Sequence, residues 1–360
     1  MKELKVMAIG IAIIIFSVFV AVLLMRGPSP RYLVNYIKNH RDNGTVSLRI
    51  QFEDKEWVRV NETQQMPLAS TVKWLVAIEF ARQAAEGTIN PKKEIPVTAM
   101  EHYYLPQLDG GAHSAWLSQL EGVVVSLEDV AKGMIRNSSN ANTDYLIELL
   151  GLDNINACAK KMGLTHQTAL YPLSASQYFP YMYMKAHQLK PEQGAEVLRQ
   201  MDAATYEAGI LEAHETLKNT QLSAEQRKEL LSYLPLDVQR VWSDRLPKAS
   251  TADYVKLMEQ LNTRAIFNDA FYDVLDPIVD TAKVNPRRYK QYAEKGGSTA
   301  WVLTMAMYAT KVNGTTMQLA FFANTDSLKE QRKLQRTIHR FIGKFVTDAR
   351  FREYVRDELK

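Results

Sequence analysis

The 360-residue sequence predicts an α/β protein of the α+β type, whose antiparallel sheet is built from both ends of the chain. Strand patterns gather near the two ends, in residues 45–62 and 298–324, and a long helical block separates them. Hydrophobic residues make up 46% of the chain and charged residues 23%, a balance typical of a globular protein with a sizeable core. We therefore expect terminal helices to cover the sheet and an all-helical lobe to pack beside it.

The first 30 residues predict a membrane anchor followed by a short linker. Residues 7–25 contain no charge and are numerous enough for one transmembrane helix. Lys2 and Lys5 precede this stretch and no small-x-small cleavage site follows it, so we expect an uncleaved signal anchor. Charge alone leaves its orientation open, because basic residues also follow it: Arg26, Arg31, Lys38 and Arg41.

The next elements form the N-terminal part of the predicted sheet. "RYLVNYIKNH" (31–40) has a helical pattern that ends at the turn residues of "RDNG". "TVSLRIQF" (45–52) and "EWVRVNE" (56–62) alternate apolar and polar residues around a charged turn, which predicts a hairpin. The first strongly apolar helix then begins within "ASTVKWLVA" (69–77).

Two further helices flank a polar loop in the middle of the chain. "SLEDVAKGMIR" (126–136) starts with a capping-box pattern, and "TDYLIELLG" (143–151) ends at a glycine. The loop between them is "NSSNAN" (137–142). A short helix after residue 152 precedes the stretch "THQTALYPLSASQYF" (165–179), which we expect to be irregular.

The C-terminal half is first helical and then returns to strands. Residues 190–245 are helical and charged, and "STADYVKLMEQL" (250–261) begins a capped helix. Residues 298–312 and 315–324 flank the turn Asn313-Gly314, a strong hairpin signal. A final amphipathic helix is expected at about 329–345.

Composition excludes several kinds of site. The single cysteine, Cys158, excludes an internal disulfide framework and a multi-cysteine metal site. The seven histidines are scattered and form no HExxH motif, so we expect neither a metal nor another cofactor. The net charge is only +4, and no basic run is interleaved with aromatic residues, so we expect no nucleic-acid partner.

Ser70 and Lys73 form a Ser-x-x-Lys pair at the start of the apolar helix. Their spacing places both side chains on one helix face, and a lysine beside Trp74 could be desolvated and lose its proton. Alternatively, Ser70 caps the helix and Lys73 extends to solvent. The pair by itself favours this second interpretation.

Two later motifs reverse that balance. Ser138-Ser139-Asn140 lies in the loop between two helices, and Lys295-Gly296-Gly297-Ser298 opens the C-terminal hairpin. With Ser70-x-x-Lys73, this ordered trio resembles the signature of class A β-lactamases and penicillin-binding D,D-peptidases. The resemblance covers about residues 30–350, except a helical block at about 180–246 that looks like an insertion within a 31–360 domain. It implies a β-lactamase/transpeptidase-like fold with the third motif on an inner strand.

The resemblance also implies a role for each matching residue. Ser70 matches the acylated nucleophile and Lys73 its proton acceptor. Ser138 matches the hydroxyl that relays a proton to the leaving group, and Asn140 a group that positions Lys73 or the substrate amide. Lys295 matches the cation that holds a substrate carboxylate. The backbone N–H groups of Ser70 and Ser298 match the oxyanion hole, and Gly297 matches the close-approach position.

The loop after the second motif departs from class A β-lactamases. These enzymes carry a glutamate there that activates the deacylating water, whereas no Asp or Glu occurs here between Asp153 and Glu192. Tyr171-Pro172 or Ser174 is expected at its place, and His166 is the nearest residue with a suitable unperturbed pKa.

The third motif departs as well, because the hydroxyl of Lys-Thr-Gly is lost at Gly296. Ser298 and Thr299 are the candidates to replace it. The stretch 102–116 and the inserted helices are expected to border the cleft.

The sequence therefore predicts a membrane-anchored serine hydrolase that acts through an acyl-enzyme. Its substrate would be an amide or ester that bears a carboxylate, such as a β-lactam or a peptidoglycan stem peptide ending in D-Ala-D-Ala. A D,D-peptidase or esterase is at least as well supported as a β-lactamase, and the alternative is a covalent penicillin sensor or a cell-wall binding module without turnover. Residues 7–25 predict a single-pass membrane protein, and the family resemblance implies a bacterial protein with its catalytic domain outside the cytoplasm.

Overall fold

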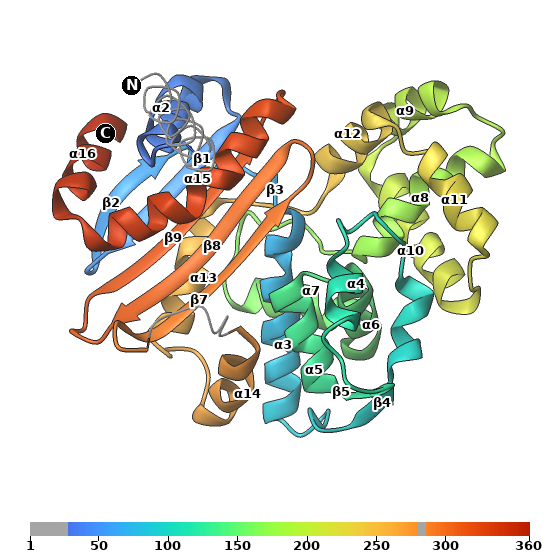
Figure 1. Cartoon of the computed structure of the whole chain (residues 1–360), viewed down its shortest axis with the longest axis horizontal. Coiled ribbons are helices and arrows are strands. Elements are labelled where there is room, and N and C mark those ends of the chain that lie inside the picture. The colour runs from blue at the N-terminus through green and yellow to red at the C-terminus, as the bar shows by residue number, and fades with distance from the viewer. Residues whose placement is uncertain (1–27, 280–285) are drawn as a thin grey trace, which may run out of the picture.

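A five-stranded antiparallel sheet contains strands from both ends of the chain, as predicted (Figure 1). The computed structural model describes residues 28–279 and 286–360. The strand order is β2-β1-β9-β8-β7. Their bounds are Val46–Phe52 for β1, Lys55–Val60 for β2, Tyr289–Ser298 for β7, Val302–Lys311 for β8 and Thr316–Asn324 for β9. The N-terminal hairpin therefore joins the C-terminal strands through the pairing of β1 with β9.

Helices from the two chain ends cover the outer face of the sheet. These are α2 (Arg31–His40), α15 (Leu328–Thr347) and α16 (Ala349–Leu359). Their apolar residues form one hydrophobic cluster with that face. The covering by terminal helices is confirmed, but the sequence predicted one C-terminal helix where the structure has two. Asp348 separates them, since its side chain accepts a hydrogen bond from Phe351 N and so starts α16 as a new helix.

The inner face packs against the helices of the middle of the chain. A 3-10 turn, Ala69–Val72, leads into α3 (Lys73–Ala85), and α13 (Thr251–Asn262) contacts β8 and β9. The other helical elements on this side are a 3-10 helix (Val97–Tyr103), α4 (Ala112–Leu117), α5 (Leu127–Lys132), a π-helical turn (Gly133–Asn137), α6 (Asn140–Leu150), α7 (Leu152–Lys161) and α14 (Asp269–Val279). The predicted cap at Ser126 is present as a capping box with Asp129.

Two short strand pairs connect distant segments of this side. One joins β3 (Met66–Pro67) to β6 (Lys248–Ala249), and the other joins β4 (Glu94–Pro96) to β5 (Val124–Ser126). The first pair fixes the chain immediately before Ser70 against the chain that follows the helical lobe.

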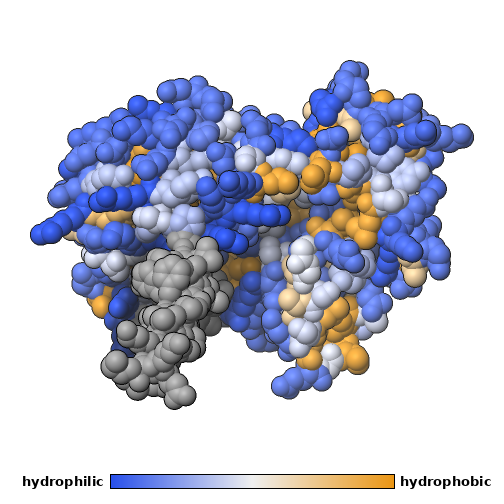
Figure 2. All heavy atoms as spheres, turned by 45° about the horizontal axis from the view of Figure 1, so that its top comes forward, coloured by the Kyte–Doolittle hydropathy of each residue, from blue (hydrophilic) through white to orange (hydrophobic). Residues whose placement is uncertain are grey.

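Five helices form the helical lobe, and they lie on one side of the molecule in Figure 1. They are α8 (Leu173–Ala186), α9 (Pro191–Gln200), α10 (Ala203–Asn219), α11 (Ala224–Ser232) and α12 (Leu236–Arg245). Figure 2 shows hydrophobic residues gathered on the helical half of the face it presents. Exposed large hydrophobic side chains of this lobe are Val197, Leu211 and Leu236.

The prediction that residues 165–179 are irregular is wrong from residue 173 onward, where α8 begins. Its first turn has no side-chain cap of its own. Instead, the carboxylate of Asp144 on α6 accepts hydrogen bonds from the backbone N–H groups of Leu173, Ser174 and Ala175. This cap comes from a distant part of the chain, so local patterns do not reveal it.

Within residues 28–279 and 286–360, none of the helices is both long and apolar enough to span a bilayer. The predicted anchor at residues 7–25 lies outside the described residues.

Candidate active site

A cleft of about 660 Å³ lies where β7, the Ala69–Val72 turn and the helical lobe meet. The residues that line it include seven of the eight predicted site residues: Ser70, Ser138, Asn140, Lys295, Gly297, Ser298 and Thr299. The eighth, Lys73, is completely buried and contacts two of them. The structure thus brings three motifs together that are far apart in the sequence.

Ser70 lies in the tight turn that starts the first buried helix. Ala69, immediately before it, has a φ of +44°, a left-handed conformation that is strained for a residue with a Cβ. The 3-10 turn then passes into α3, whose first residue is Lys73. The sequence alternative in which Lys73 reaches solvent is excluded, because none of its surface is exposed.

The amine of Lys73 points to the second motif. Its Nζ donates to Ser138 O at 2.5 Å and to Asn140 Oδ1 at 2.8 Å, and it lies 3.4 Å from Ser138 Oγ. Burial holds the pKa of Lys73 well below its usual value of 10.5, and the nearby charge of Lys295 lowers the pKa further. Asp109 and Asp144 act in the opposite direction but are the smaller influences.

Ser138 lies between the π-helical turn and α6, with a φ of +69°. The next residue, Ser139, is completely buried and caps α6, since its Oγ accepts from Asn142 N at 3.1 Å. Its Oγ also lies 2.8 Å from Nδ1 of the buried His113. Ser139 therefore stabilises the loop from its buried side.

Lys295 approaches the same loop from the sheet. Its Nζ donates to Ser138 Oγ at 3.0 Å and to Gly296 O at 2.7 Å. Burial lowers the pKa of Lys295 from 10.5 to about 8, and Glu294 opposes this shift. Ser138 Oγ thus lies between two lysine amines.

The third motif lies on β7, the edge strand of the sheet, and not on an inner strand as predicted. An edge strand keeps one side of its backbone unpaired within the sheet, which allows an extended ligand to pair with it.

Gly297 allows β7 to approach the Ser70 turn closely. A Cβ at Gly297 would lie 2.5 Å from Ser70 N and 2.7 Å from Leu68 O. Thr304 on β8 also holds the sheet against the chain before Ser70, because its Oγ1 donates to Leu68 O at 2.7 Å. Only glycine fits at position 297.

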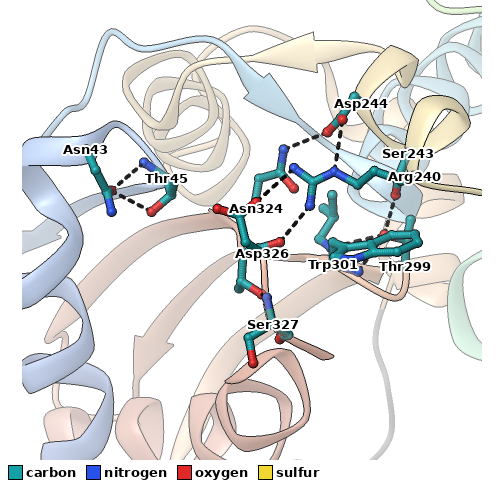
Figure 3. Close-up of polar contacts among 12 residues, drawn as sticks. Asn43, Thr45, Arg240, Ser243, Asp244, Thr299, Trp301, Asn324, Asp326 and Ser327 are labelled. Carbon is teal, nitrogen blue, oxygen red and sulfur yellow. Dashed lines mark hydrogen bonds and ion pairs between the residues drawn. The ribbon is translucent and has the colours of Figure 1, made fainter. Parts of the chain in front are cut away.

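The two residues after Gly297 differ in their surroundings. Ser298 is exposed at the end of β7. The Oγ1 of Thr299 accepts hydrogen bonds from Ser243 Oγ and from the backbone N–H groups of Trp301 and Val302 (Figure 3). Thr299 lines the cleft, but its hydroxyl is already occupied by these partners.

Two polar residues of the cleft were not singled out from the sequence. Gln177 on α8 is largely buried, accepts from Asn140 Nδ2 at 3.3 Å and donates to Leu108 O at 2.8 Å. Asp109 is the one carboxylate that lines the cleft in the described part of the chain. Its oxygens accept from the backbone N–H groups of Gly111 and His113. The predicted border at residues 102–116 is thus present, and the Asp-Gly-Gly turn within it was the available signal.

The residues suggested for the place of the missing glutamate do not line the cleft. Tyr171 is buried and its hydroxyl donates to Arg245 O, and Ser174 belongs to the first turn of α8. His166 faces Asp253 on α13, with 3.5 Å between His166 Nδ1 and Asp253 Oδ1. From this segment, Leu173 and Gln177 reach the cleft.

Comparison with known proteins identifies the fold and the family. A search of curated proteins finds no match. A β-lactamase from Sphaerobacter thermophilus aligns with a TM-score of 0.54 and 18% identity over 86% of this chain and 95% of its own. A β-lactamase from Chitinophaga pinensis aligns with a TM-score of 0.52 and 15% identity over 87% and 98%. A point mutant of PBP-A, solved as an acyl-enzyme with penicillin G, aligns with a TM-score of 0.52 and 16% identity over 89% and 98%.

The family profile described as "Beta-lactamase enzyme family" matches residues 31–277, which is more than half of the chain. The protein is therefore a serine hydrolase and belongs to the beta-lactamase enzyme family.

Proposed function

We propose that the protein forms an acyl-enzyme at Ser70 with a carboxylate-bearing β-lactam or D-Ala-D-Ala-type peptide, and that it releases the acyl group slowly. The observation that carries this proposal is the convergence of two lysine amines on Ser138 beside the Ser70 turn. A neutral amine can accept the proton of the serine, a hydroxyl can relay it to the leaving group, and a cation can bind a substrate carboxylate.

Acylation would begin with proton transfer from Ser70 to Lys73. A neutral amine has two N–H groups, and Ser138 O and Asn140 Oδ1 can accept both of them, so the lone pair stays available. Ser70 Oγ then bonds to the substrate carbonyl carbon, the C–N bond breaks, and the proton passes from Lys73 through Ser138 to the leaving nitrogen. The N–H groups of Ser70 and Ser298 would stabilise the oxyanion.

Lys295 would bind the substrate carboxylate. It is the one lysine or arginine among the described residues that line the cleft. An ammonium that is nearly buried attracts a carboxylate strongly because water screens the pair poorly.

Deacylation lacks an obvious base. Water must attack the ester and release a carboxylic acid, which regenerates the Ser70 hydroxyl. Gln177 occupies the position beside Asn140 but cannot accept a proton, and both oxygens of Asp109 are held by backbone N–H groups. These contacts favour a penicillin-binding D,D-peptidase, or the alternative of a penicillin sensor or binding module without turnover, over a fast β-lactamase.

Parallel assays of the full chain separate these activities. We expect release of D-alanine from a D-Ala-D-Ala peptide and little hydrolysis of a chromogenic cephalosporin. Ser70→Ala should abolish the release of D-alanine. Rapid cephalosporin turnover would instead indicate a β-lactamase, and stable acylation without peptide cleavage would indicate a sensor or binding module.

We further propose that residues 7–25 anchor the protein in a bacterial cell membrane, with the domain of residues 31–360 outside the cytoplasm and its helical insertion at about 180–246. The uncharged stretch and the β-lactamase family membership support this proposal. The protein should stay with membranes after carbonate extraction and be digested by protease added to intact spheroplasts. Protection from that protease would contradict the orientation.

A further inference from the structure

The last helix of the helical lobe, α12, contacts both sides of the proposed oxyanion hole. Gln239 and Trp242 of α12 line the cleft, as does Leu246 just after it. Leu246 forms a small buried cluster with Ala69 and Val302, and Trp242 packs against this cluster. Ala69 precedes Ser70, and Val302 follows the turn after Ser298. The cluster therefore lies behind both backbone segments that would supply the oxyanion donors.

Ser243 of α12 holds the turn that follows Ser298. It is completely buried, and its Oγ donates to Thr299 Oγ1. Thr299 Oγ1 also accepts from Trp301 N at 3.2 Å and from Val302 N at 3.0 Å. Figure 3 shows Ser243, Thr299 and Trp301 lying together at the end of the hairpin turn.

Arg240, one turn earlier on α12, ties the helix to the same region of the sheet. Its guanidinium donates to Thr325 O at 2.7 Å and lies 3.4 Å from Asp326 Oδ1. It also stacks over Trp301, with its Cζ 5.6 Å from the ring centroid. Since Thr325 N donates to Trp301 O at 3.0 Å, Arg240 and the turn share these neighbours (Figure 3).

The backbone after α12 holds the other side of the hole. Leu68 N donates to Pro247 O at 2.9 Å, and Met66 pairs with Ala249. The helix and its C-terminal extension thus contact the chain before Ser70 and the chain after Ser298 as one unit. Loss of the contacts on one side would therefore let one N–H donor move relative to the other.

We propose that α12 sets the spacing of the oxyanion donors, with Ser243 and Arg240 as positioning residues. The inference rests on the proposed acylation of Ser70. Loss of one oxyanion donor typically slows acyl transfer about 100- to 1,000-fold. A donor that is displaced but still present should cost less, so we expect roughly a tenfold effect from Ser243→Ala.

The test measures acylation of the full chain by penicillin, with the maximal acylation rate separated from the apparent binding constant. Ser243→Ala should lower the maximal rate about tenfold and leave binding within about twofold. It should also weaken a boronic acid inhibitor about tenfold, because the tetrahedral adduct on Ser70 places an oxygen in the hole. Arg240→Gln, at a partly exposed side chain, should also lower the maximal acylation rate and weaken the boronic acid inhibitor.

Matched control variants test whether any substitution in the helical lobe slows acylation. Ser232→Ala on α11 and Arg199→Gln on α9 change the same residue types outside the cleft lining and should leave the rate unchanged. In a double-mutant cycle, Ser243→Ala should add nothing to Thr299→Val, because Thr299→Val already removes the acceptor of the Ser243 hydroxyl along with that of Trp301 N and Val302 N.

The possible outcomes separate this inference from the proposed function. No penicillin adduct on the unmodified chain would overturn the proposed function, and the inference with it. An adduct that forms equally fast with Ser243→Ala and Arg240→Gln would overturn the inference alone. A slower rate that results only from weaker penicillin binding, with boronate affinity unchanged, would also overturn it.

Discussion

Lys73 illustrates how much a single residue depends on its surroundings. The Ser-x-x-Lys pair by itself favoured a lysine that extends to solvent, but in the structure Lys73 is fully buried, with its pKa lowered by burial. Removing its amine should slow acylation by about 100-fold or more, the range expected for loss of a proton acceptor. Stopped-flow acylation of Lys73→Met checks this prediction. The exposed Lys160→Met serves as the control, and equal rates for both variants would contradict the role of Lys73.

The lowered pKa of Lys295, about 8, predicts an alkaline limit to acylation. Below this pKa the amine is protonated and attracts a substrate carboxylate, and above it the amine progressively loses that charge. The apparent second-order rate constant for penicillin should therefore fall as the pH rises through the pKa of about 8. For an ester substrate without a carboxylate, the rate constant should not fall over this pH range. An equal fall of the rate constant at high pH for both substrates would contradict the role of Lys295 in binding the carboxylate.

The sequence predicted the residues of the three motifs but not the groups that complete the cleft. Ser70, Ser138 and Lys295 were predictable because each belongs to a short ordered pattern. Gln177 and Asp109 were missed, since their position depends on how α8 and the 107–111 turn fold back over the loop. Gln177 carries no local signal, whereas Asp109 belongs to an Asp-Gly-Gly turn in the stretch that was expected to border the cleft. Tertiary contacts bring both side chains to the cleft.

At the scale of elements, β7 approaches the Ser70 turn closely at Gly297. Gly297→Ala would place a methyl group 2.5 Å from Ser70 N, so backbone must move. We expect a loss of about 1–3 kcal/mol of unfolding free energy and at least roughly tenfold slower acylation. Gly343→Ala in α15 meets no atom within 4 Å and should be neutral or stabilising. Thermal unfolding and penicillin acylation of the two variants check this, and unchanged acylation in Gly297→Ala would contradict it.

Helix α8 presents Gln177 where a carboxylate could activate water beside Asn140. Gln177→Glu should therefore shorten the lifetime of the acyl-enzyme by roughly tenfold or more, because it supplies a general base. Gln239→Glu on α12 adds the same charge to another wall of the cleft and is the matched control. Decay of the penicillin adduct, followed by mass, checks this prediction. Equal acyl-enzyme lifetimes for the two variants would show that the missing base at position 177 does not limit deacylation.

Most elements were predictable because their signals are local. The Asn313-Gly314 turn, the Ser126 cap and the amphipathic pattern of α15 each specify their own segment. The start of α8 was missed because its cap, Asp144, lies on another helix. Burial raises the pKa of Asp144 to about 6 despite these N–H contacts.

At the scale of the whole molecule, the sheet separates two hydrophobic clusters and joins the two halves of the site. Alternate residues of β8 enter different clusters: Ala306 and Tyr308 pack with the central helices, and Met305 and Met307 pack with the terminal helices. The sequence predicted one sheet built from both chain ends, because strand patterns gather near the two ends with a helical block between them. It did not predict that α12 would contact the β7–β8 turn, because that contact depends on individual side chains, such as Ser243, whose sequence context carries no signal for it.

The central claim is that Ser70 is acylated and that release of the acyl group is slow. The most direct measurement is a time course of intact mass after mixing the full chain with penicillin, for the natural sequence and for Ser70→Ala. We predict one covalent adduct per chain that maps to Ser70, persists after excess penicillin is removed, and is absent in Ser70→Ala. An adduct that forms equally in Ser70→Ala, or no adduct and no Ser70-dependent ester hydrolysis, would contradict the account.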